Sequence, residues 1–260
     1  ILSEMRRLAE GGAREQILIA QDTSRYGRDL GMKDGLAGLI RDAAQISGID
    51  WLRVLYLYPS DVNRALIDAL SENSKFCRYI DIPLQHASPD LLRRMNRRGD
   101  IDEIKDTLLY AREKEFALRT TFIVGFPGET KEEFECSKAF LEQVGFFEMH
   151  IFKYSRREGT VADRMPDQLT DAAKSARSDE LFELEREQSR AFRSDYIGKW
   201  AEVLWEEMRI IDKETYFVGH TADYVKIAVP EWDKDIRNTI TRVYVRGFLS
   251  DELMLAKHET

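Results

Sequence analysis

Short β-rich runs alternate with amphipathic helical segments along the first 155 residues of the chain. Each run is bounded by polar residues, Pro or Gly, which separate it from the segments on either side. This alternation is the pattern expected of a parallel sheet covered by helices, and five parallel strands are the simplest prediction. The predicted strands are Gln16–Gln21, Leu52–Tyr58, Arg78–Gln85, Leu118–Gly125 and Glu148–Tyr154.

Helix start signals fall between these runs. Ser88–Pro89 supplies an N-cap followed by proline at the first helical position, and Asp100–Glu103 and Thr130–Glu133 have the spacing of a capping box. After position 100, apolar residues repeat at helical spacing and form one face. The chain opens on a helical segment, Ile1–Glu10, so an α/β barrel requires a strand that precedes this sequence.

The last third of the chain has a different pattern. Residues 170–197 are highly charged and helical, and Gly198 ends this connector helix. Five strand-like runs follow with turn residues between them and no helix signal, which predicts a small closed antiparallel β-barrel of the OB-like kind. The runs are Trp200–Trp205, Thr215–Val218, Tyr224–Val229, Ile240–Val245 and Leu253–Ala256. We therefore predict an α/β barrel over 1–169, a connector over 170–197 and a β-barrel over 198–260.

Charge and cysteine content limit the function classes. The formal net charge of -8 argues against broad, sequence-independent binding to nucleic acid, which needs a basic face. No apolar run approaches the roughly 18 to 20 residues that cross a bilayer, so we expect a cytoplasmic location. Cys77 and Cys136 lie 59 positions apart, a spacing that supports neither a disulfide framework nor a metal site, and we interpret both as reduced thiols.

Polar residues follow four of the five predicted strands. An α/β barrel holds its ligands at the carboxyl ends of its strands, so these residues are candidates for binding a polar cofactor. Turns and helix caps enrich the same residue types, and composition alone leaves both readings open.

Four sequence motifs say more about the function of the chain than the spacing of its strands and helices does. They are IAQDTSRYG (19–27), YIDIPLQHASPDLLRRMNRRG (79–99), RTTFIVGFPGET (119–130) and FKYSRREGT (152–160). Together, over roughly residues 1 to 200, they resemble the radical S-adenosylmethionine (SAM) methylthiotransferases. The first two motifs favour the branch of the family that modifies ribosomal protein uS12 over the branch that modifies tRNA adenosines.

The resemblance implies a partial, open TIM-like radical-SAM barrel followed by a substrate-recruiting TRAM domain. In the family, an iron–sulfur cluster reduces SAM to a 5′-deoxyadenosyl radical, and a methylthio group is inserted at an unactivated carbon, in this branch the β-carbon of a uS12 aspartate. The full-length family carries two [4Fe–4S] clusters. Its three-cysteine motif, Cys-x3-Cys-x2-Cys, is expected before Ile1, so no catalytic or metal-binding residue is assigned here and this chain alone is expected to be inactive.

The resemblance assigns nine residues to SAM: Gln21, Asp22, Thr23, Gln85, Ser88, Arg119, Val124, Gly125 and Phe126. The first three are implied to approach the methionine end, the next two to face the ribose or carboxylate, and the arginine to pair with the carboxylate through its planar fork. The backbone of the last three is implied to lie along the adenine. Simpler interpretations are an N-cap for Ser88, a turn for Asp22 and tight-turn glycines at 125 and 128.

Several other polar residues in these motifs have structural interpretations. His86 is interpreted as a strand-end histidine whose hydrogen bonds are satisfied, because the family chemistry needs no base there. Arg93, Arg94, Arg97 and Arg98 form two i, i+4 pairs, which we interpret as a solvated helix face rather than a phosphate contact.

The C-terminal domain bears on the choice of substrate. From Gly198 onward it has 9 Lys and Arg against 12 Asp and Glu, which suits a basic ribosomal protein better than RNA. The stretch GHTADYVKIAV (219–229) instead resembles the accessory domain of the tRNA-modifying relatives that act on threonylcarbamoyladenosine. The alternative substrate is therefore a tRNA adenosine, either threonylcarbamoyl- or isopentenyl-adenosine. Three interpretations therefore remain: a uS12 methylthiotransferase working with the small ribosomal subunit, a tRNA methylthiotransferase, and a cluster-less binding module derived from such an enzyme. An electron donor and a monomeric state are expected from the family.

Overall fold

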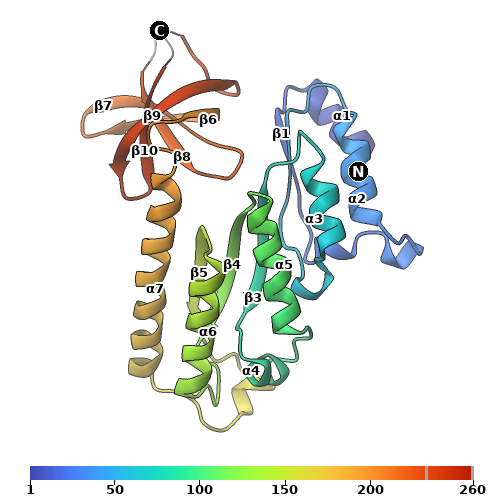
Figure 1. The fold of residues 1–260 in the computed structure, drawn as a ribbon, viewed down its shortest axis with the longest axis vertical. Coiled ribbons are helices and arrows are strands. Elements are labelled where there is room, and N and C mark those ends of the chain that lie inside the picture. Colours follow the sequence, from blue (N-terminus) through green and yellow to red (C-terminus); the bar gives the residue numbers. More distant parts are fainter. Residues whose placement is uncertain (232–233, 259–260) are drawn as a thin grey trace.

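The computed structural model describes residues 1–231 and 234–258, and it contains the five predicted parallel strands (Figure 1). Strand β1 (Glu15–Leu18) pairs with β2 (Trp51–Val54), and β3 (Tyr79–Gln85), β4 (Ala117–Val124) and β5 (Glu148–Lys153) form a second parallel sheet in that order. A parallel bridge at Leu52 and Phe76 joins the two sheets. The predicted strand positions are therefore confirmed, with ends shifted by up to four residues.

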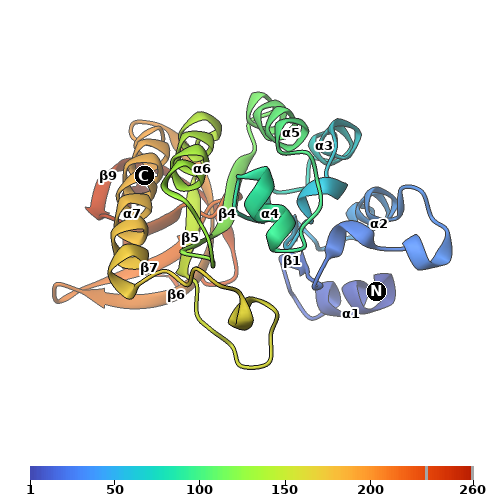
Figure 2. The same ribbon diagram turned by 90° about the horizontal axis from the view of Figure 1, so that it is seen from below.

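Helices cover one face of these strands. They are α1 (Leu2–Glu10), α2 (Gly35–Ala44), α3 (Arg64–Ser71), α5 (Ile101–Glu113) and α6 (Lys131–Val144), whereas the short helix α4 (Pro89–Arg94) lies at the carboxyl ends of the strands (Figure 1). Figure 2 shows α2, α3, α5 and α6 in a row along one side of the strands. The core lies between the two layers, where Ile40, Ile67, Leu108 and Leu141 are at most 1% exposed. Short 3-10 helices occur at Thr23–Arg25, Arg28–Leu30, Pro59–Asp61 and Ala162–Arg164.

The predicted helix caps are present. The Ser88 hydroxyl accepts the Leu91 N–H at 3.3 Å, and Thr130 and Glu133 form both halves of a capping box. At Asp100 the side chain accepts from the backbone of positions 102 and 103, so the N-cap half of that predicted box is present. Each cap satisfies helix N–H groups that have no partner within the helix, which fixes where the helix begins.

Alternation along β4 gives the sheet two different sides. Leu118, Phe122 and Val124 are buried against the helices, whereas Arg119, Thr121 and Ile123 point the other way and are half-buried. This alternation follows from the period of two in a strand. We call the side away from the helices the inner face.

Helix α7 (Asp171–Ser194) leads to a closed barrel of strands β6 (Trp200–Ile211), β7 (Glu214–His220), β8 (Lys226–Pro230), β9 (Ile240–Ser250) and β10 (Leu253–His258). Thr170 caps the helix, and Gly198 has φ +78 beyond its end. Four strand pairs of the barrel are antiparallel, but β10 and β8 pair in parallel. The predicted closed barrel is thus confirmed, and the expectation that it is wholly antiparallel is corrected.

The barrel packs on the parallel strands near their amino ends. Arg53 of β2 is fully buried, and its guanidinium carbon lies 5.1 Å from the Tyr79 ring centroid and 3.6 Å from that of Tyr224. Its Nε donates to Glu15 at 2.8 Å, and the Nε2 of His220 in β7 lies 2.9 Å from the same carboxylate. The carboxyl ends of the strands remain at the opposite end of the molecule (Figure 1).

No helix in the described part of the chain is both long enough and apolar enough to span a membrane.

Candidate functional site

Two adjoining cavities lie at the carboxyl ends of β3, β4 and β5. The first, here called the rim cavity, has a volume of about 480 Å³; the second, the inner cavity, has about 600 Å³. The rim cavity is lined by Gln85, Arg94, Met95, Asn96, Arg97, Ile123, Phe126, Tyr154, Val161, Ala162 and Met165. The inner cavity shares Gln85, Ile123, Tyr154 and Ala162 with it and adds Thr121, Phe152, Lys153, Ser155, Arg157 and Thr160.

Local backbone geometry places the shared residues. Gln85 ends β3 with φ +72, a conformation that breaks the regular strand. Ile123 is on the inner face of β4, and the rings of Phe126 and Tyr154 meet edge to face at a centroid distance of 5.3 Å. The Tyr154 hydroxyl is buried and has no hydrogen-bond partner among the described residues, and burial raises its pKa. The site thus combines aromatic walls with polar groups, as cofactor pockets commonly do.

The predicted adenine segment 124–126 lies beside these cavities. Phe126 lines the rim cavity, and Val124 is a core residue whose carbonyl accepts the Tyr154 N–H at 2.8 Å. Gly125 has φ +74 and donates its N–H to the Glu129 carboxylate. A Cβ at Gly125 would collide with the Lys174 side chain, so close packing as well as φ requires glycine there.

Ser88 is a helix cap in the structure and is 4% exposed. Its hydroxyl lies 3.3 Å from the Glu133 carboxylate and accepts from Leu91. Unlike Gln85, it is not among the residues that line the rim and inner cavities of the described chain. Its assignment to the ribose or carboxylate of SAM stays a prediction.

Arg119 is the third residue of β4, on the inner face and toward the barrel end. Its Nη1 donates to the Asp81 carboxylate at 2.6 Å, and its Nη2 lies 2.6 Å from His150 Nδ1. Burial, and then the Arg119 charge, lower the pKa of His150. The guanidinium predicted to pair with a cofactor carboxylate therefore already has a protein carboxylate as its partner.

The segment Gln21–Thr23 follows β1 and bonds to the chain after β2. The Thr23 hydroxyl donates to the Leu55 carbonyl at 2.6 Å, and Asp22 accepts from the Ser24 hydroxyl, which is the turn role open to it. Gln21 is exposed. In the described chain this segment does not line the rim or inner cavity, so its contact with the methionine end of SAM stays a prediction.

His86 is buried, and its ring nitrogens have protein partners, as the sequence predicted. Nε2 lies 3.0 Å from Glu129 Oε1, and the Ser137 hydroxyl lies 3.0 Å from Nδ1. Glu129 also accepts from Arg177 of α7 at 2.6 Å. The buried Glu129 carboxylate therefore links the end of β3, the turn after β4 and α7 through its hydrogen bonds.

The interpretation of the arginines as a solvated face is wrong for Arg97, which is half-buried, whereas Arg93, Arg94 and Arg98 are exposed. Arg94 pairs with Glu133 at 2.7 Å, and Arg97 donates to the Pro83 carbonyl at 3.0 Å with its guanidinium 5.3 Å from the Tyr58 ring. Both line the rim cavity. Sequence reasoning missed the burial of Arg97 because α4 ends at Arg94, so helical spacing does not continue to Arg97.

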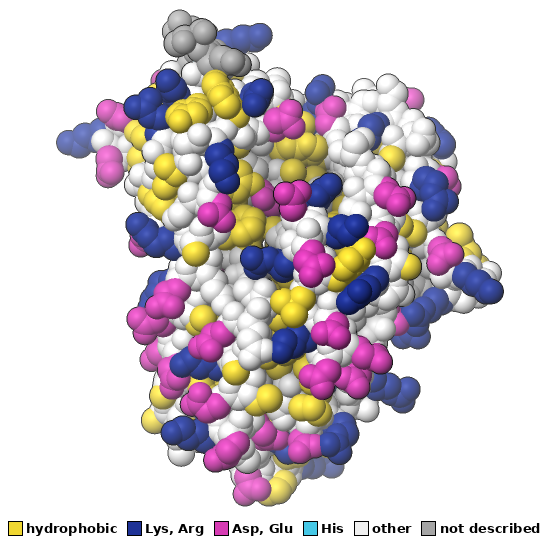
Figure 3. All heavy atoms as spheres, viewed as in Figure 1, with side chains coloured by type: hydrophobic (Ala, Val, Ile, Leu, Met, Phe, Trp, Pro, Cys, Tyr) yellow, Lys and Arg dark blue, Asp and Glu magenta, His cyan; other side chains and the backbone are white. Residues whose placement is uncertain are grey.

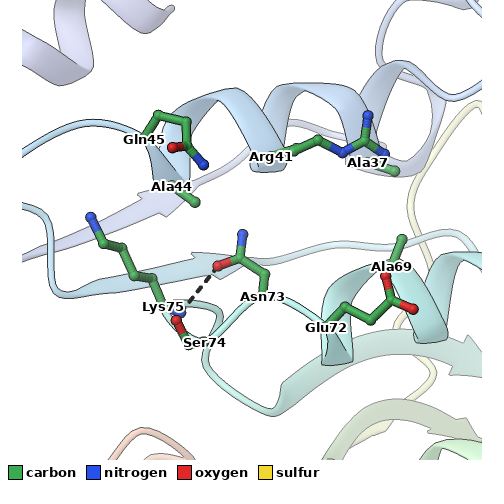
Figure 4. Close-up of a pocket in the computed structure, with 9 residues that line it drawn as sticks. All are labelled: Ala37, Arg41, Ala44, Gln45, Ala69, Glu72, Asn73, Ser74 and Lys75. Atoms are coloured by element: carbon green, nitrogen blue, oxygen red, sulfur yellow. Dashed lines mark hydrogen bonds between the residues drawn. The ribbon is translucent and has the colours of Figure 1, made fainter.

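Other surfaces are less suited to a cofactor. A polar cavity of about 330 Å³ lies between α2 and α3, on the outer side of the fold (Figure 4). It contains Arg41, Glu72 and Lys75, but the Lys75 ammonium is bonded to the Ile46 carbonyl at 2.9 Å. The face drawn in Figure 3 intersperses basic and acidic side chains, which agrees with the absence of a broad basic surface on that side.

The described residues do not fit an iron–sulfur cluster. Cys77 is 1% exposed and packs against Trp51 of β2 and Leu204 of the barrel strand β6. Burial raises the pKa of its thiol to about 12. Cys136 is exposed on α6 and lies 59 positions after Cys77 in the sequence. No group of three or more His, Cys, Asp or Glu residues in residues 1–231 and 234–258 could hold a metal ion. Thiolate ligation of a cluster needs several deprotonated cysteines together.

Comparisons with known proteins agree with this architecture. Residues 1–141 match the Radical SAM superfamily. The chain is 44% identical over 208 residues to "Ribosomal protein uS12 methylthiotransferase RimO" of Clostridium kluyveri, covering 79% of this chain and 47% of that protein. It is 41% identical over 255 residues to the protein of the same name of Clostridioides difficile, covering 97% and 57%. The chain therefore spans about half the length of the curated relatives it matches.

Solved structures show a similar fold. Coproporphyrinogen III oxidase (HemN) from Escherichia coli, a radical SAM enzyme, has a TM-score of 0.54 at 14% identity and covers 85% of this chain and 59% of its own. The radical SAM methyltransferase TsrM from Kitasatospora setae, with cobalamin and a [4Fe-4S] cluster bound, has a TM-score of 0.50 at 17% identity and covers 60% and 31%. At these identities the likeness concerns the fold alone.

Proposed function

Because this chain belongs to the Radical SAM superfamily, we propose that it forms the SAM-binding and accessory parts of a methylthiotransferase that acts on the β-carbon of an aspartate in ribosomal protein uS12. The observation that carries the proposal is the 41% identity to a uS12 methylthiotransferase over 255 residues, because that alignment includes the C-terminal barrel as well as the parallel strands. Division of the chain into 1–169, 170–197 and 198–260 belongs to the same proposal.

Superfamily members use SAM and a [4Fe–4S] cluster, and reductive cleavage of SAM supplies the one-electron chemistry that protein side chains lack. In this chain the rim and inner cavities are the proposed SAM site. Phe126 and Tyr154 would hold the adenine between their rings and the backbone of 124–126, and Gln85 would contact the ribose. The chain's two cysteines do not supply a cluster site, so its ligands would come from polypeptide outside these 260 residues.

Two of the nine residues predicted to bind SAM have firm support as cavity residues. Gln85 and Phe126 line the same cavity, and Arg94 and Arg97 bring positive charge to its rim. We propose that Arg97 is better placed than Arg119 to meet the SAM carboxylate, because Asp81 already neutralises Arg119 at 2.6 Å.

The alternative substrate is a tRNA adenosine. It is favoured by the sequence of residues 219–229 and by an exposed aromatic and cationic pair on the barrel, where Arg242 lies 5.3 Å from the Trp200 ring centroid. Stacking surfaces of this kind bind unpaired bases. The acidic balance of the barrel and its inclusion in the uS12-type alignment favour the protein substrate.

One experiment separates these functions. The full-length gene is expressed in a host that lacks both activities, and uS12 and total tRNA nucleosides are analysed by mass spectrometry. We expect a methylthio mass increase on uS12 and none on tRNA. A mark on tRNA alone supports the alternative, and the absence of a three-cysteine motif in the full-length sequence supports the cluster-less binding module.

A further inference from the structure

The turn that follows β4, residues 125–129, is stabilised by hydrogen bonds to its own last residue, Glu129. The side chain of Glu129 is fully buried, and its carboxylate accepts the N–H of Gly125 four residues earlier in the chain. The Glu129 N–H in turn donates to the Phe126 carbonyl at 2.9 Å, and the Val124 carbonyl accepts from Tyr154. These bonds fix the backbone conformation of the turn and the direction in which the Phe126 ring enters the rim cavity.

Helix α7 supplies the outer partner of this turn. Nη1 of Arg177 donates to Glu129 twice, to the carboxylate at 2.6 Å and to the main-chain carbonyl at 3.0 Å. The Arg177 side chain is 16% exposed, so water competes only weakly for these bonds. His86 on the other side of the carboxylate completes the set of donors, at 3.0 Å.

A second residue of the same helix packs on the turn. Lys174 lies one helical turn before Arg177, and its stem fills the space that a Cβ at Gly125 would need. Its ammonium lies 5.7 Å from the Tyr154 ring centroid, and that ring meets Phe126 in the cavity wall. The first two turns of α7 therefore contact both the backbone and an aromatic wall of the proposed SAM site.

We infer that Arg177 is a positioning residue for SAM: through the Glu129 carboxylate it holds the 125–129 turn in the conformation that receives the adenine. The inference rests on the proposed function and deepens it, because it assigns part of the cofactor site to the helix that carries the C-terminal barrel. Arg177 itself lines neither cavity in the described chain and acts through Glu129. Its planar guanidinium reaches the carboxylate and the carbonyl together, which a lysine ammonium does less well.

The test uses the full-length enzyme with reconstituted clusters and three variants. Arg177→Gln removes the charge, Arg177→Lys keeps it, and Arg186→Gln is the matched control at an exposed position of α7. We measure the KM for SAM and kcat in 5′-deoxyadenosine formation, the KM for uS12, and amide hydrogen exchange of residues 125–130. For Arg177→Gln we expect the KM for SAM to rise on the order of tenfold or more, as misplaced binding groups commonly cause.

The expected pattern is specific. In Arg177→Gln, hydrogen exchange of the 125–130 amides increases, whereas the KM for uS12 stays within about twofold of the wild-type value. Arg177→Lys recovers part of the loss in the KM for SAM. Arg186→Gln behaves as wild type. Faster exchange with an unchanged KM for SAM would overturn the positioning role, and so would equal losses for SAM and uS12, which indicate general destabilisation. Wild-type enzyme that forms no 5′-deoxyadenosine contradicts the proposed function itself, a result distinct from either.

Discussion

The guanidinium of Arg53 lies 3.6 Å from the centroid of the Tyr224 ring and joins the amino end of the parallel strands to the C-terminal barrel. Arg53 is fully buried and bonds at 2.8 Å to Glu15, which is also in contact with His220. A buried cation between two aromatic rings is stable only when its charge is balanced, and Glu15 supplies that balance. The contact between the two parts of the molecule therefore includes a buried charge pair, beside the apolar cluster in which Tyr79, Ala117 and Phe147 pack on the barrel core.

Replacement of Arg53 by Ala should destabilise the protein strongly. The change leaves the Glu15 carboxylate with His220 alone and removes packing from two rings, and breaking a buried pair typically costs about 3 to 5 kcal/mol. Urea unfolding at neutral pH measures the loss. Arg93→Ala is the control, because that side chain is 75% exposed, and it should change the unfolding free energy by less than about 0.5 kcal/mol. Equal effects in the two variants would contradict the role assigned to Arg53.

The same charge pair should make stability depend on acid pH. Burial alone raises the pKa of Glu15, but the His220 hydrogen bond and the Arg53 charge outweigh it, and the net pKa lies below the ordinary 4.5. A carboxyl with a lowered folded-state pKa stabilises the fold at pH values above its unfolded pKa, and this stability is lost as pH falls through the folded value. Unfolding free energy should therefore decrease below about pH 4.5, and a Glu15→Gln variant should show a smaller decrease. Parallel pH profiles of the two proteins would refute this.

Two glycines in the turn after β4 allow the energetic cost of a positive φ to be measured separately from the cost of close packing. Gly125 and Gly128 have φ of +74 and +75, but a Cβ at Gly125 would meet Lys174, whereas one at Gly128 has nothing within 4 Å. Gly128→Ala should cost about 1 kcal/mol from φ alone, and Gly125→Ala clearly more. Thermal unfolding of both variants measures the difference. If the two have the same Tm, the contact between Lys174 and the turn does not constrain this position.

Tyr154 should tolerate loss of its hydroxyl. The atom is buried without a partner among the described residues, so Tyr154→Phe removes a polar group that gains no bond, and stability should stay the same or rise. Tyr196→Phe is the contrasting variant, because that hydroxyl donates to the Asp223 carboxylate, and its loss should cost about 1 to 3 kcal/mol. Urea unfolding distinguishes the cases. A large loss in Tyr154→Phe would show that this hydroxyl has a stabilising contact.

The order and type of elements could be predicted from sequence because strand and helix periods are local properties. Hydrophobic spacing and capping residues predict the five parallel strands, the Ser88 and Thr130 caps and the connector helix. Hydrophobic spacing underestimates the lengths of β6 and β9, which reach Ile211 and Ser250, because ladder pairing continues through polar positions that give no hydrophobic signal.

Contacts between residues far apart in the sequence explain most of the features that sequence patterns do not predict. The motif assigns Arg119 to a cofactor carboxylate, which stays a prediction, but it does not reveal that the register of β3 and β4 sets Arg119 opposite Asp81. Helical spacing places Arg97 in solvent, but the helix ends before it and its guanidinium donates to the Pro83 carbonyl. In both cases the partner lies in another element, and no local pattern marks it.

The parallel pairing of β10 with β8 leaves the final strand hydrogen-bonded on both of its sides. Truncation before Leu253 would therefore remove more than a peripheral tail: it would open the ring and leave β8 and β9 with unpaired edges. Unpaired edges of this kind are templates for association between molecules. Chains shortened at this point should lose solubility before they lose the parallel strands.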